Sequence, residues 1–70
     1  MLTTDQIISF FEGRIAQLKL NGDREGMRRC QLALGVLIEA AEHHNDANTA
    51  RRLRVLAARA ANDREALEDD

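Results

Sequence analysis

The sequence predicts an all-α fold: an antiparallel helical hairpin and a third helix, which together make a three-helix bundle. The chain of 70 residues contains no proline, tryptophan or tyrosine. Alanine, leucine, glutamate, arginine and glutamine, which favour helices, dominate its composition. Apolar residues also recur at intervals of three and four, the spacing of one helix face. A chain of this length has room for a single domain, residues 1–70, with one thin core.

The first helix is predicted over residues 4–20. Thr3 and Gln6 have the spacing of a capping box, which fixes the start of a helix. Gly22 suits the left-handed residue that follows a helix end. The predicted buried face consists of Ile8, Phe11, Ile15 and Leu18, widened by Ile7. Phe10 falls outside this face; it is either a contact residue, which makes it a candidate for the interface, or a residue that covers the edge of the core.

The second helix is predicted over residues 24–43, with Asp23 as its N-cap. The turn before it is short, so the first two helices should run antiparallel. A heptad seam able to pack against the first helix is formed by Met27, Cys30, Leu34, Leu37, Ala41 and His44.

The third helix is predicted over residues 47–67, capped by Asn45 or Asp46. Its apolar stripe consists of Ala50, Leu53, Leu56, Ala57, Ala60 and Leu67. Because alanine buries little area, we expect this helix to be the weakest-held element. The acidic end, residues 68–70, is expected to fray.

The run from Leu32 to Ile38 is apolar on every side of the second helix, and one partner helix can cover only one side. Leu32 and Val36 point away from the heptad seam, and Gly35 beside them would let another backbone approach. We therefore expect dimerisation to complete the bundle. The candidate partner or dimer interface consists of Phe10, Leu32, Gly35, Val36 and Val55, with Arg52 and Arg59 as a polar rim.

Charges segregate along the third helix, with Arg51, Arg52, Arg54 and Arg59 in its first half and acidic residues at its end. This order opposes the helix dipole, so it does not stabilise the isolated helix. An antiparallel copy of the same helix would pair each basic half with an acidic half. Alternatively, this is a solvated face with local pairs, Arg59 with Asp63 and Arg64 with Glu68.

Clustered arginines can also neutralise phosphates, so a nucleic-acid-binding regulator that uses the first half of the third helix is the alternative function. The four arginines spread around more than half of the helix, and no aromatic residue lies between them for base stacking. The net charge of −2 gives no overall attraction to nucleic acid. Nucleic acid is therefore the less favoured partner.

Patterns that indicate catalysis, a metal or a cofactor are not found. The four glycines are scattered, so no phosphate-binding loop is predicted. His43 and His44 are adjacent and would point about 100° apart on a helix. Cys30 occupies the heptad seam, where core packing is the simpler role. We predict that the protein is not an enzyme and has no catalytic, metal-binding or cofactor-binding residues.

The sequence thus favours a small protein–protein interaction module, an adaptor, chaperone or inhibitor of a partner protein, that acts through apolar helix faces as a homodimer. A single cysteine and the lack of a recognisable export signal suggest the cytoplasm. No apolar run approaches the roughly 20 residues that a membrane helix needs, so no membrane association is expected.

Overall fold

The computed structural model describes residues 1–67, which form three α-helices and no strand. The helices are α1 (Thr4–Asn21), α2 (Arg24–His43) and α3 (Ala47–Ala66). These bounds lie within one residue of the limits expected from the sequence. The acidic end that was expected to fray, residues 68–70, lies outside the described part of the chain. No helix of residues 1–67 has the length and hydropathy that would let it cross a membrane.

Local side-chain hydrogen bonds fix the start of each helix. The Gln6 amide donates to the Thr3 hydroxyl over 3.1 Å, and the Gln6 side chain accepts from the Thr3 amide over 2.9 Å, which completes the capping box. Asp23 accepts from the Gly26 amide over 2.8 Å, and Asp46 accepts from the Thr49 amide over 3.1 Å. Asp46 is therefore the cap of α3. These bonds satisfy amides that have no partner inside the helix.

Each of the two turns contains one residue in the left-handed backbone conformation. Gly22, with φ of 65°, follows α1, and its amide donates to the Lys19 carbonyl while the next amide, that of Asp23, donates to Leu18. This is the Schellman arrangement that glycine favours. The second turn contains Asn45 with φ of 57°, a conformation that asparagine tolerates better than most residues.

The core lies between the three helices and is built from the apolar stripe of each one. Its buried members are Ile8, Ile15, Leu18, Met27, Cys30, Leu34, Ala41, Ala50, Leu53, Leu56 and Ala60. All of them belong to the predicted stripes. Phe11 and Leu37 are only partly buried, and His44 is exposed, so the predicted seam of α2 opens toward its C-terminal end.

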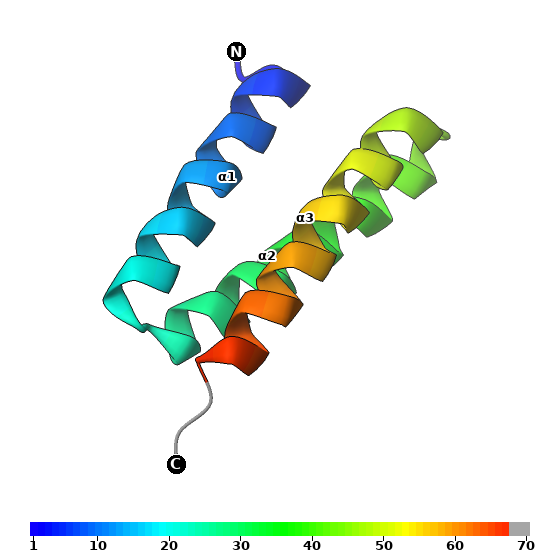
Figure 1. Ribbon diagram of the computed structural model, residues 1–70. Coiled ribbons are helices and arrows are strands. Elements are labelled where there is room, and N and C mark those ends of the chain that lie inside the picture. The colour runs from blue at the N-terminus through cyan, green and yellow to red at the C-terminus, as the bar shows by residue number, and fades with distance from the viewer. Residues whose placement is uncertain (68–70) are drawn as a thin grey trace.

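The helices do not pack equally. By far the most extensive contact joins α2 and α3, which lie side by side, whereas α1 diverges from them toward its N-terminus (Figure 1). The expectation that the third helix is the weakest-held element is therefore wrong, because α1 makes the fewest contacts with the other two helices. Alanines such as Ala50 and Ala60 let the backbones of α2 and α3 approach closely, which outweighs their small area.

α1 and α2 lie closest to each other at the turn that joins them. A Cβ atom built on Gly26 would lie 2.5 Å from Leu18 Cδ2 and 2.6 Å from Asp23 Oδ2. A larger residue at this point would force the side chains of Leu18 and Asp23 to shift, so glycine suits the place where the end of α1 approaches the first turn of α2. From this point α1 diverges from α2, and Ile7 in its first half lines two pockets together with Leu37 in the second half of α2.

Candidate protein-binding surface

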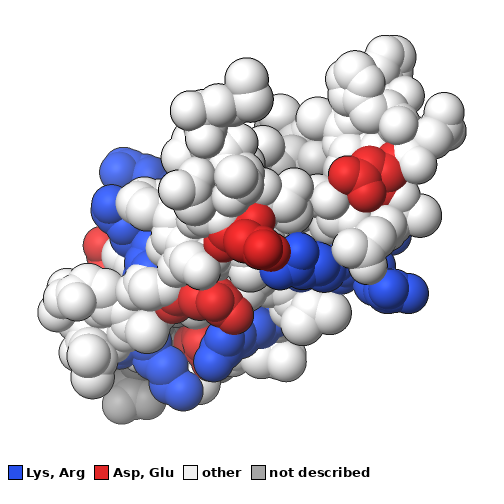
Figure 2. Space-filling model, turned by 90° about the horizontal axis from the view of Figure 1, so that it is seen from above, with Lys and Arg blue, Asp and Glu red and all other residues white. Residues whose placement is uncertain are grey.

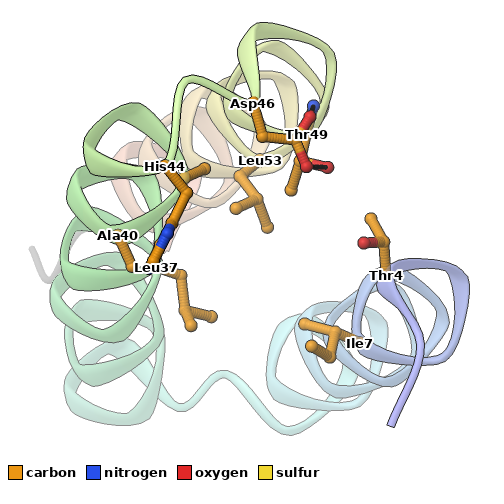
Figure 3. Close-up of a pocket in the computed structure, with 9 residues that line it drawn as sticks. Thr4, Ile7, Leu37, Ala40, His44, Asp46, Thr49 and Leu53 are labelled. Carbon is orange, nitrogen blue, oxygen red and sulfur yellow. Dashed lines mark hydrogen bonds between the residues drawn. The ribbon is translucent and has the colours of Figure 1, made fainter.

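An apolar groove opens between the first half of α1 and the second half of α2. One pocket of about 370 Å³ is lined by Leu2, Gln6, Ile7, Phe10, Phe11 and Leu37. A second pocket, of about 210 Å³, is lined by Thr4, Ile7, Leu37, Ala40, Ala41, His44, Asp46, Thr49 and Leu53. Ile7 and Leu37 line both pockets, so they form one continuous surface, which we call the interhelical groove. In Figure 3, Ile7 on α1 faces Leu37 and Leu53 across its open end.

Polar atoms at the end of the groove are engaged in capping α3. The Asp46 carboxylate accepts from the Thr49 amide and, over 2.7 Å, from the Thr49 hydroxyl. The Thr49 side chain and then its amide hold the pKa of Asp46 below its ordinary value. This carboxylate is charged and hydrogen-bonded at neutral pH, so it fixes the wall of the groove and has a structural role.

Phe10 forms the rim of the groove and is 57% exposed. Its ring meets that of Phe11 edge to face at 5.7 Å, and the Arg14 guanidinium lies 5.2 Å from the Phe10 ring centre. Both contacts hold the ring in place. A fixed, half-exposed aromatic ring beside an apolar hollow is the kind of residue that anchors protein interfaces.

Leu32 and Val36 lie on the outer side of α2, 58% and 64% exposed. No side chain of the described chain encloses them. A Cβ atom built on Gly35 would meet nothing within 4 Å, so no neighbouring segment exploits this glycine within one molecule. The expectation that a close neighbour explains Gly35 is therefore not met by α1 or α3.

The remaining candidate residues lie on a different face. Arg52, Val55 and Arg59 line a shallow pocket of about 260 Å³ between α1 and α3, together with Ile8, Glu12 and Leu56. The sequence-based candidates thus fall on three surfaces: Phe10 on the interhelical groove, Leu32, Gly35 and Val36 on the outer side of α2, and the last three between α1 and α3. The structure does not bring them together as one interface.

Three of the five arginines of α3 bind side chains of the same chain. Arg52 pairs with Asp5 on α1 at 2.8 Å, Arg54 pairs with Glu42 on α2, and Arg51 donates to Asn48 over 3.0 Å. Figure 2 shows the same mixing on the face seen from above, where acidic and basic side chains touch one another and form no single-sign patch. These ion pairs give the charge order of α3 a role within one molecule.

The predicted local pair of Arg59 with Asp63 is wrong, because Asp63 pairs with Lys19 of α1 at 3.5 Å. The other predicted pair involves Glu68, which lies outside the described residues. Helix spacing identified which charges could meet along α3. It could not show that α1 supplies closer partners.

Cys30 is buried, and burial raises the pKa of its thiol, which disfavours the nucleophilic thiolate. His43 and His44 stack edge to face at 5.3 Å. Within residues 1–67, no three His, Cys, Asp or Glu side chains lie close enough together to hold a metal ion.

Comparisons of the chain with models of protein families, with curated proteins and with solved structures gave no match. The function is therefore argued from the geometry. The sequence-based candidates omitted Ile7 and Leu37, which connect the two halves of the groove. The apolar periodicity assigns both to buried faces, and no local feature distinguishes them from core residues, because the opening depends on where α1 lies relative to α2.

Proposed function

We propose that the protein is a non-catalytic protein–protein interaction module that binds an amphipathic helix of a partner protein in the interhelical groove. In this proposal α1 and α2 are an antiparallel hairpin that is open toward the N-terminus of α1. A partner helix would lay its apolar face between Ile7 and Leu37, with Phe10 as the anchor at the rim. An adaptor, a chaperone and an inhibitor all act through such a contact.

The observation that carries this proposal is the continuous apolar lining of the groove beside the exposed ring of Phe10. Burying such a surface is favourable by about 25 cal/mol for each Å² removed from water. The alternative of nucleic-acid binding receives less support, because two of the four arginines in question already pair with carboxylates.

The test is selection from a display library of helical peptides with apolar residues at i, i+3, i+4 and i+7. Selected peptides should bind the wild-type protein and lose about tenfold or more in affinity for the Phe10→Asp variant. Leu20→Asp is the matched control, because Leu20 is exposed on the same helix and does not line the groove. Failure to select a binder, or equal losses in both variants, would contradict the proposal.

We also propose that the module works as a homodimer, because Leu32 and Val36 remain uncovered in one molecule. Replacing both with aspartate should abolish the dimer in sedimentation equilibrium while circular dichroism shows unchanged helicity. An oligomeric state that these substitutions leave unchanged would exclude the two residues as an interface.

A further inference from the structure

The outer side of α2 carries a second heptad seam, on the side opposite the buried one. It consists of Glu25, Arg29, Leu32, Val36, Glu39 and His43, which are separated by steps of four and three. Members of this seam are exposed; the side chains of Glu25 and Arg29, which form an ion pair at 3.8 Å along the helix, are still 54% and 76% accessible. In Figure 3, α1 and α3 lie on the side of α2 that carries Leu37 and Ala40, and all six residues of the outer seam are exposed.

We propose that this outer seam pairs with the same seam of a second copy, antiparallel about a two-fold axis. The inference rests on the homodimer of the proposed function and specifies its surface and register. In this register Leu32 of each copy faces Val36 of the other. On either side of this apolar centre, Arg29 faces Glu39, and farther out Glu25 faces His43. A two-fold axis forms each of these pairs twice.

Charge complementarity indicates that the seam binds a second copy of itself and that the two copies of α2 run antiparallel. Parallel pairing of two copies would place Arg29 against Arg29 and Glu39 against Glu39, and juxtaposed like charges are unfavourable. The antiparallel arrangement turns both repulsions into attractions. The seam is therefore self-complementary in one direction only, which is a property expected of a surface that meets its own copy.

The register is selected by the same charges. Sliding one helix by a heptad in one direction would place Arg29 against Leu32, and sliding it in the other would place Glu39 against Val36. Each slip buries a charge against an aliphatic side chain and also separates the two aliphatic residues from each other. Only the proposed register keeps the apolar residues together and the opposite charges paired.

Gly35 receives a role in this arrangement. In the same register it faces Ala33 of the other copy, so two small residues meet beside the apolar centre. The space around Gly35 is open in one molecule, with nothing within 4 Å of a built Cβ atom. Small residues at this point allow the two copies of α2 to approach closely.

The first test is a charge-reversal cycle, read as the dimer dissociation constant in sedimentation equilibrium. Arg29→Glu and Glu39→Arg should each weaken the dimer by about tenfold or more, because each creates two like-charged pairs. The double variant should restore the dissociation constant to within about threefold of wild type. Arg51→Glu on α3 makes the same charge change away from the seam and should leave dimerisation unchanged. Failure of the double variant to restore dimerisation would overturn the proposal.

The second test determines whether the two copies of α2 run antiparallel or parallel, and it does not use the charge variants. With Cys30 replaced by alanine, Leu32→Cys protein is mixed with Val36→Cys protein and oxidised. The proposed register predicts that disulfides between the two variants predominate over those within either one. Predominant disulfides between identical variants would indicate parallel pairing and overturn the proposal.

These outcomes separate the inference from the proposed function. Charge variants without effect, together with a dimer that Leu32→Asp still disrupts, would reject the register and retain the homodimer. A protein that is monomeric at millimolar concentration would reject both. Peptide binding in the interhelical groove is tested with the Phe10→Asp variant, and its result does not depend on the dimer.

Discussion

The α2–α3 pair and the α1–α2 pair are built from similar amphipathic helices. However, α2 and α3 pack closely along their length, whereas α1 and α2 leave an apolar groove between them. On α3 the buried stripe consists of two alanines and two leucines, and α2 lies closely against it. On α1 only Ile8 is buried near the N-terminus, while its neighbours Ile7 and Phe11 are partly buried and Phe10 is exposed. The comparison teaches that small residues bring helices together, while bulky residues without a facing hollow keep them apart and leave a binding surface.

The largest expected effect compares two leucines of the same helix. Leu34 is completely buried in the core, whereas Leu37 lines the groove. Leu34→Ala should lower the free energy of unfolding by about 2–5 kcal/mol, because it leaves a cavity among close-packed atoms. Leu37→Ala should cost clearly less in urea denaturation. Equal losses would show that the groove is closed in solution.

Two glycine substitutions test how closely α1 and α2 approach each other at the turn that joins them. Gly26→Ala forces a methyl group against Leu18 and the capping carboxylate of Asp23, so it should destabilise the protein by about 1 kcal/mol or more. Gly13→Ala is the control, because the space around Gly13 is open. That change should stabilise the protein by about 0.5–1 kcal/mol and so raise the midpoint of thermal unfolding. If both variants are stabilised, the ends of α1 and α2 are not in close contact.

A smaller effect concerns the ion pair that ties the first turn of α1 to α3. A double-mutant cycle with Asp5→Ala and Arg52→Ala should give a coupling energy of about 0.2–1 kcal/mol, since both side chains are substantially exposed. The coupling should shrink as salt concentration rises. Loss of the pair should also speed hydrogen exchange in the first half of α1 relative to α2. Equal exchange in the two helices would contradict the weaker attachment of α1.

The smallest expected effect is a pH dependence at the turn between α2 and α3. The pKa of Asp46 is held below its ordinary value near 3.8 by the Thr49 hydrogen bonds, so its contribution to stability is present above about pH 4. This contribution is lost as pH falls through the lowered pKa. Asp46→Asn keeps a good cap that does not titrate. Below pH 4 the variant should lose less stability than wild type, measured by urea denaturation across pH 2.5–6; parallel curves would exclude this role.

The sequence by itself determined where each helix begins and which residues face the core. Thr3, Asp23 and Asp46 cap helices through bonds that span three residues, and the period of the apolar stripe is a property of one helix, so both signals are local. The exposure of Leu32 and Val36 follows from the same period, since they lie opposite the buried stripe.

Only the tertiary structure decided which helices close on one another and which charges meet. The distance between α2 and α3 depends on how the stripes of both helices fit together, and neither stripe contains that information alone. The pairing of Asp63 with Lys19, in place of Arg59, likewise depends on where α1 comes to lie. The interhelical groove exists for the same reason: it is the space that remains when α3 holds α2 and the bulky first half of α1 packs less closely.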